Sequence, residues 1–397
     1  MSHHTRRFAL AIACVLLTEA PQRVVAGGAA RAPSVQSQAA SDANGRLVRA
    51  SMVGDLTEVK AALADGASAN APADAHMTAM GVAALYGRAE IVRILAAQGA
   101  DVSADQGGQT PLVLAAGEGH TQTVEALIAL GAKVGAKDKM GVTALMAAAS
   151  ANRVGTVKAL LAHGADPRDA TTEGSTALMA AAYGGYADVV SALIAGGADV
   201  NAKDGSGRTP LMAAALAGDG AVARTLLAAK ADPNAEDSGG STALVYAAAN
   251  GHVGLVTALI QGGSKKGLDQ AFPFAIRGCH TDLAKKLVEL GAKTTGRIDG
   301  VSTVVLAASA NCTPALEFLI GRGIDVNAAN EDGTTALMVA AAEGYVSAAK
   351  LLLDHGANLE ATNQNKETAW LLAAMANQLE IVEIFKAHRA AREKEKR

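Results

Sequence analysis

The chain has 397 residues; half are hydrophobic and only 3% are aromatic, with Ala, Leu and Val dominating. Such a composition predicts a core of small side chains that lets helices approach closely, rather than one built on aromatic rings. The net charge of −3 at pH 7, without a basic stripe that carries interleaved aromatic residues, argues against a nucleic-acid partner.

The first 26 residues have the layout of a secretory signal peptide. Basic residues precede an apolar run at Phe8–Leu17, and a small residue, Ala26, ends the segment. About ten apolar residues are too few for a membrane anchor, which needs about 20. We therefore expect export to the periplasm or the medium, with lipidation of Cys14 as an alternative. Residues 27–43 are rich in Ala, Ser, Gly and Gln and predict a flexible leader.

A pattern of about 33 residues then recurs along the chain. Eight of its copies begin with a threonine: Thr78, Thr110, Thr143, Thr176, Thr209, Thr242, Thr335 and Thr368. In the copy TALMAAASANRVGTVKALLAHGAD, Thr143 is placed to cap a short helix, and Asn152 is placed to end it in the left-handed conformation. A second apolar-periodic helix follows, and Gly164 ends it. Neither helix alone can bury its apolar face, so the copies must stack.

The consensus T-[PA]-L-x-x-A-A-x-x-G-x-x-x-x-V-x-x-L-[LI]-x-x-G-A-D, over roughly residues 42–391, resembles the ankyrin repeat. The resemblance implies an all-α solenoid of about eleven helix-turn-helix units, including caps. We divide it into a first block at 44–263 and a second at 264–391, followed by a charged tail at 392–397. The connection after the first block is short, which predicts a missing finger loop or a kink, and Pro273 is expected near the start of the next helix.

One departure from the ankyrin pattern is a methionine after the leucine of the first helix. It occurs as Met146, Met179, Met212 and Met338. Such a stripe suits either an adaptable or metal-binding face or packing between repeats. Because the position alternates with Val and Leu, as at Leu371, we expect packing.

Residues for catalysis or metal binding do not form a recognisable pattern. The histidines outside the N-terminal segment and the His76 loop sit at repeat positions, with no HExxH or CxxC motif. GDGAVA at residues 218–223 imitates a dinucleotide-binding loop, but no strand is expected before it, so we interpret it as a chance match. We expect a protein that is not an enzyme and that needs no metal or cofactor.

Two cysteines, Cys279 and Cys312, lie in neighbouring units near the ends of their first helices. Export would permit a disulfide between them. Stacked equivalent positions are about 10 Å apart, whereas a disulfide needs Cα atoms within about 7 Å. Both a bridge across the irregular junction and two buried thiols therefore stay open.

The ankyrin resemblance implies a concave groove, lined by the finger loops and the exposed side of the first helices, where a partner protein docks. By register, the candidate binding residues are Tyr86, Glu118, Lys139, Met140, Tyr183, Arg208, Arg277 and Glu343. Tyr86 and Tyr183 are expected as the only aromatic anchors, with Lys139 and Arg208 supplying charge. We expect a monomeric, non-catalytic interaction scaffold. The alternatives are a secreted effector that acts in another cell and a small-ligand binder that uses residues 264–312.

Overall fold

The computed structural model describes residues 35–72, 77–106 and 108–395. The expected signal peptide, Cys14, the first part of the leader and His76 lie outside them. The described residues form 22 helices in two compact units, residues 1–210 and 211–397, and each unit is described by itself. The all-α architecture of stacked helix pairs is confirmed, with eleven pairs in all among the described residues.

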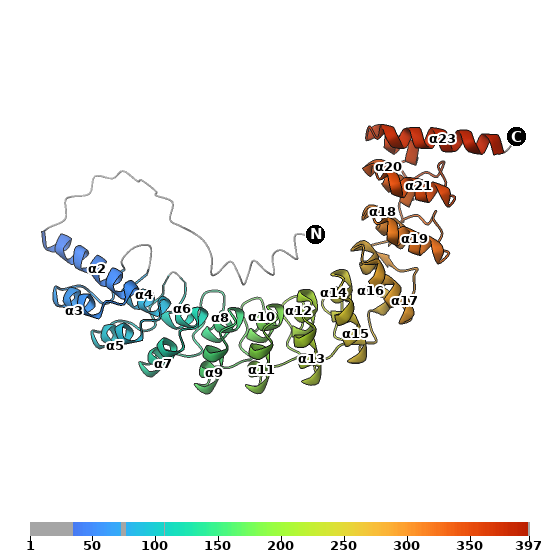
Figure 1. Cartoon of the computed structure of the whole chain (residues 1–397). Coiled ribbons are helices and arrows are strands. Elements are labelled where there is room, and N and C mark those ends of the chain that lie inside the picture. The colour runs from blue at the N-terminus through green and yellow to red at the C-terminus, as the bar shows by residue number, and fades with distance from the viewer. Residues whose placement is uncertain (1–34, 73–76, 107, 396–397) are drawn as a thin grey trace. The chain divides into compact units, whose positions relative to one another are not determined.

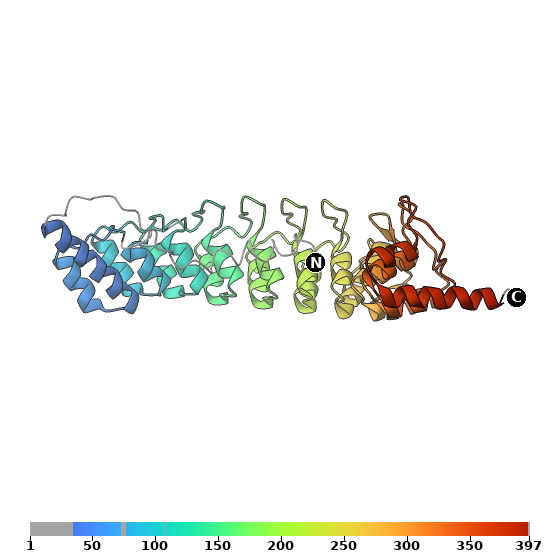
Figure 2. The same ribbon diagram turned by 90° about the horizontal axis from the view of Figure 1, so that it is seen from above.

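Each pair has a first helix and a second, antiparallel one. In unit 1 the first helices are α2 (Val35–Val53), α4 (Ala79–Leu85), α6 (Pro111–Glu118), α8 (Ala144–Ser150) and α10 (Ala177–Tyr183). Their second helices are α3 (Leu56–Ala64), α5 (Ala89–Ala97), α7 (Thr121–Ala129), α9 (Val154–Ala162) and α11 (Ala187–Ala195). Within this unit, the first helices line one side and the second helices the other (Figure 1). The loops that join consecutive pairs project from the same end of the helices (Figure 2).

The pairs continue in unit 2. Its first helices are α12 (Pro210–Ala217, which begins at the boundary), α14 (Ala243–Ala249), α16 (Leu268–Arg277), α18 (Thr303–Ser309), α20 (Ala336–Glu343) and α22 (Ala369–Met375). The second helices are α13 (Gly220–Ala228), α15 (Val253–Gln261), α17 (Thr281–Glu289), α19 (Thr313–Gly321), α21 (Val346–Asp354) and α23 (Leu379–Glu395). A two-residue hairpin, β1 (Arg297–Ile298) with β2 (Val301–Ser302), forms one of the finger loops.

Local sequence signals set the ends of these helices. Thr143 has extended backbone, and its Oγ1 accepts a hydrogen bond of 3.3 Å from the Met146 backbone N–H, which closes the first turn of α8. Asn152 ends the helix at φ 59°, and Gly164 ends α9 at φ 84°. The capping threonine and the two left-handed stops are therefore confirmed.

Packing between first helices buries the methionine stripe. Met146 is 6% exposed, and Met179, Met212 and Met338 are each 1% exposed or less. Alanines beside them are fully buried, which lets neighbouring helices approach closely. Leu371 holds the same position in the last described repeat and is 44% exposed. The packing interpretation is therefore confirmed for the methionines but wrong for Leu371, which lies on the outer side of the final pair.

Three boundaries differ from the sequence-based expectation. Helix α2 begins at Val35 and buries Ala43 to 2% exposure, so the second half of the expected flexible leader is helical because its alanine packs on the array. At the other end, α23 continues to Glu395, so most of the charged tail is helical too. Helix α16 begins at Leu268, which places Pro273 in the interior of the helix rather than near its start. Proline there removes one backbone hydrogen bond of the helix.

The short connection lies between α15 and α16. Residues 262–267 replace the usual finger loop, and Gly267, at φ 83°, turns the chain directly into α16. The finger loop is therefore absent at this junction, as the sequence predicts. The carboxylate of Asp269, in the first turn of α16, accepts a 2.9 Å hydrogen bond from the backbone N–H of Lys293. That bond, with the Lys293 ammonium at 3.2 Å, lowers the pKa of Asp269.

Candidate functional site

The groove side of unit 1 is formed by α6, α8 and α10 together with the finger loops before them. Backbone hydrogen bonds join successive fingers edge to edge. The Thr172 N–H donates to the Met140 carbonyl at 2.9 Å, and the Gly205 N–H donates to the Glu173 carbonyl at 2.8 Å. These bonds join the fingers at residues 138–142, 171–175 and 204–208 into one wall.

A pocket of about 110 Å³ lies between this wall and the helices. Its floor is apolar and contains Val113, Met146 and Ala147. Met140, which is 44% exposed, and the half-buried Val142 form one side. The same methionine position that packs between repeats therefore also lines the bottom of an open hollow.

Two candidate residues mark the end of a first helix on the groove side. Tyr86 follows α4 and is 45% exposed, so a large amphipathic ring stands in solvent. Glu118 is the last residue of α6 and is exposed, with one carboxylate oxygen 3.9 Å from the Arg153 guanidinium. The last residue of α10, Tyr183, is half-buried. Tyr86 is therefore the more accessible of the two expected anchors.

The finger residues are held in different ways. Lys139 is 81% exposed in its side chain, and its ammonium lies 3.7 Å from the Asp105 carboxylate. Arg208 donates from Nε to Asp204 Oδ2 at 2.9 Å and is only 24% exposed in its side chain. Because Asp204 is buried and also accepts the Arg208 backbone N–H, this arginine stabilises its own finger. The expected role of Arg208 in supplying charge to a partner stays a prediction, with its Nε already bonded within the finger.

This arrangement of pairs and fingers agrees with a comparison against protein families. A family model described as "Ankyrin repeats (3 copies)" matches overlapping segments that together span residues 47–396. The chain belongs to the ankyrin-repeat family. No curated protein matches the chain significantly. Ankyrin repeats are generally non-catalytic and serve as protein-interaction scaffolds, which gives the chain a protein-binding role.

In unit 2 the ankyrin groove carries aromatic residues that the sequence analysis missed. Tyr246 in α14 occupies the repeat position that Ala147 occupies in α8. Its hydroxyl donates a hydrogen bond to Asp237 Oδ2 at 2.5 Å. The guanidinium of Arg277, an exposed candidate in α16, lies 4.6 Å from the centroid of the Phe274 ring. Tyr86 and Tyr183 are therefore not the only aromatic residues at groove positions. The signal was an aromatic four residues after the capping threonine, a position that is Ala, Val or Leu in the other threonine-capped copies.

The last candidate, Glu343, ends α20 and is exposed. In the finger that precedes this helix, Asp332 accepts hydrogen bonds from the backbone N–H and the hydroxyl of Thr334, both at 2.9 Å. These bonds stabilise the carboxylate and lower the pKa of Asp332. The finger is therefore anionic and internally bonded at neutral pH.

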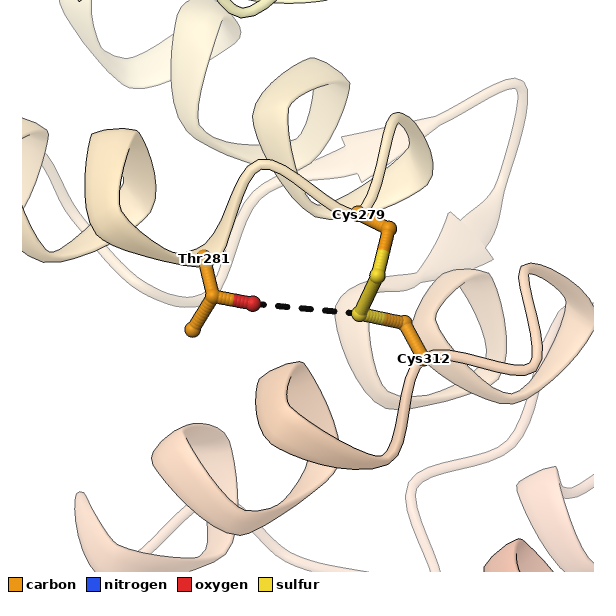
Figure 3. Close-up of a disulfide and its surroundings, with 3 residues drawn as sticks. All are labelled: Cys279, Thr281 and Cys312. Carbon is orange, nitrogen blue, oxygen red and sulfur yellow. Dashed lines mark hydrogen bonds between the residues drawn. A yellow bond between two sulfur atoms is a disulfide. The ribbon is translucent and has the colours of Figure 1, made fainter.

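The structure joins Cys279 and Cys312 in a disulfide, with their Cα atoms 5.5 Å apart (Figure 3). Cys279 follows α16 at φ 59°, and its counterpart in the next unit is Asn311, at φ 49°. Cys312 is one residue further on, at the start of α19, and this offset places it closer than stacked equivalents would be. Cys279 is exposed while Cys312 is 1% exposed, so the alternative of two buried thiols does not describe this pair.

The histidines that follow first helices have structural positions. A ring N–H of His120 donates from Nε2 to the Leu85 carbonyl of the preceding ankyrin unit at 3.0 Å. The same ring covers Gly87, where an added Cβ would lie 2.6 Å from Nδ1. His252 covers Gly218 in the same way.

Within residues 35–72, 77–106 and 108–395, no group of three His, Cys, Asp or Glu side chains is arranged to hold a metal ion. None of the described helices is long and apolar enough to cross a membrane.

Proposed function

We propose that the chain is an exported, non-catalytic scaffold that binds a partner protein through the ankyrin groove. The observation that carries the proposal is the open apolar pocket between the finger wall and α8, flanked by the exposed side chain of Met140. Large apolar side chains that stay in solvent beside a hollow are typical of interaction sites. Tyr86 adds an exposed ring of the kind that dominates binding energies.

The rigidity of the groove supports the same function. The fingers at residues 138–142, 171–175 and 204–208 are hydrogen-bonded to one another. The first of them is also bonded internally, because Asp138 accepts the backbone N–H groups of Met140 and Val142 at 2.8 Å. A surface that is ordered before binding loses less conformational entropy when the partner docks. A repeat array of this kind therefore suits binding by shape rather than by folding around a ligand.

Export is the second part of the proposal. It rests on the layout of residues 1–26 and is compatible with the Cys279–Cys312 bridge, since disulfides persist in oxidising compartments. The test is mass spectrometry of the protein from fractionated cells. We expect a periplasmic or extracellular chain that begins at Gly27. A cytoplasmic chain that retains Met1 would contradict export but not the binding role.

The binding role is tested by photocrosslinking in the native compartment. A photoreactive phenylalanine replaces Tyr86 on the groove side in one variant. In a matched variant it replaces Glu125, an exposed residue of the second helix α7. We expect a discrete adduct with a partner protein from position 86 and none from position 125. Equal adducts from both positions, or none from either, would remove the groove as the binding surface.

A further inference from the structure

The pocket beside α8 is too small for a typical small-molecule ligand. Its volume is about 110 Å³, whereas small-molecule sites usually enclose roughly 300–1,000 Å³. Its apolar floor of Val113, Met146 and Ala147 offers no charged group. A hollow of this size and lining suits one apolar side chain of a polypeptide.

The rim of the pocket carries one uncompensated charge. Glu173 lines the pocket and is exposed, and its carboxylate has no hydrogen bond or ion pair with any other described residue. The charged groups nearby in the same fingers are already engaged. The Lys137 ammonium lies 2.7 Å from the Asp169 carboxylate, and the Lys139 ammonium lies 3.7 Å from that of Asp105. A cationic group on the occupant would therefore complement the rim.

A polar group for a peptide backbone also lines the pocket. Gln109 lines the pocket and is half-buried, and its side-chain amide has no hydrogen-bond partner among the described residues. An amide both donates and accepts, so it can pair with a backbone C=O and N–H together. The rim thus offers a hydrogen-bonding group and a negative charge around an apolar hollow.

We propose that this pocket, built from Val113, Met140, Met146 and Glu173, binds an extended segment of the partner protein that presents a Leu or Met side chain beside a basic residue. The inference rests on the proposed scaffold function and names the chemistry of the segment that the scaffold binds. The apolar side chain enters the hollow, and the basic side chain pairs with Glu173.

Two variants separate the contributions. Ser150→Tyr fills the pocket, because Ser150 lines it. The fold tolerates tyrosine at this register, since Tyr183 holds the equivalent position at the end of α10. Glu173→Lys reverses the rim charge at an exposed position and leaves the hollow open. Glu317→Lys is the matched control, an exposed glutamate of the second helix α19, remote from the pocket in sequence and absent from its lining.

The probe is a phage-displayed library of random nonapeptides selected on the purified full-length mature chain. We expect enriched peptides in which Leu or Met stands within two residues of Arg or Lys. By fluorescence polarisation, Ser150→Tyr should weaken an enriched peptide by roughly ten- to a hundredfold, the value of one buried aliphatic side chain. Glu173→Lys should weaken it by about fivefold or more, as expected for an exposed pair turned from attraction to repulsion. Glu317→Lys should bind like the native chain.

Selection on Glu173→Lys should favour Asp or Glu in place of the basic residue. The proposal is overturned if no family of peptides is enriched, if the basic residue is absent from the family, or if Glu173→Lys selects the same peptides as the native chain. A partner that crosslinks at position 86 but binds Ser150→Tyr and Glu173→Lys normally would overturn this inference alone. Absence of any crosslinked partner would instead overturn the scaffold function.

Discussion

The Cys279–Cys312 disulfide allows a direct test of what stabilises the repeats around it. It closes a loop of 33 residues between two consecutive ankyrin units. In the chain-entropy treatment, closing a loop of that length lowers the conformational entropy of the unfolded state and so stabilises the fold by about 3.7 kcal/mol at 25 °C. Because each unit contacts only its neighbours, the effect should concentrate in α16 to α19 rather than spread over the whole array.

The assay is hydrogen exchange followed by mass spectrometry, with and without reductant. Reduction should accelerate exchange of backbone amides in α16 to α19 and leave those of α4 to α7 unchanged, which serve as an internal reference. The urea midpoint of unit 2 should fall as well. The double variant Cys279→Ala/Cys312→Ala is the control and should show no response to reductant.

Two results would refute this reasoning. If mass spectrometry finds the bridge intact before reduction, yet exchange in α16 to α19 does not change on reduction, the loop does not limit local unfolding. If free thiols are found before reduction, the bridge does not form in the native compartment.

Three further predictions concern the repeat itself and are checked by urea unfolding. Thr143→Val should lower the free energy of unfolding by about 1 kcal/mol because it removes a helix cap. Thr242→Val should be neutral or stabilising, since its buried hydroxyl has no hydrogen-bond partner among the described residues. Equal losses of unfolding free energy in the two variants would contradict this. Met338→Ala should lower the free energy of unfolding by about 2–5 kcal/mol and Leu371→Ala by under about 1 kcal/mol, because only the Met338 side chain is buried. A larger loss for Leu371→Ala than for Met338→Ala would show that the exposed side of α22 is covered. Asp269→Asn should destabilise the protein at pH 7, because the pKa of Asp269 is lowered in the folded state. The stability that the Asp269 carboxylate contributes is complete above about pH 4 and is lost as the pH falls through the folded pKa. A difference in unfolding free energy between the native chain and the variant that persists in strong acid would contradict this.

Sequence reasoning predicted the parts of the fold that depend on local chemistry. The cap at Thr143 and the left-handed stop at Asn152 each follow from the preference of one residue for one conformation. The helical content of residues 35–43 depends instead on Ala43 finding a surface to pack on, which the local composition does not reveal.

The groove was harder to predict than the fold. Register placed Tyr86 and Met140 correctly on exposed positions. It could not show that Arg208 turns back onto Asp204, because an arginine on a finger looks the same in sequence whether it is paired or not. Nor could it show the pocket, because the hollow depends on how three neighbouring units sit together.

Hydroxyl-radical footprinting tests whether a partner covers the groove in the native compartment, without knowledge of the partner. Oxidation of Tyr86 and Met140 is compared between intact cells and purified protein, with Leu130 and Tyr345, at the end and the start of second helices, as references. We expect strong protection of Tyr86 and Met140 in cells while the references oxidise equally in both samples. Equal oxidation of all four residues in cells and in purified protein would contradict it.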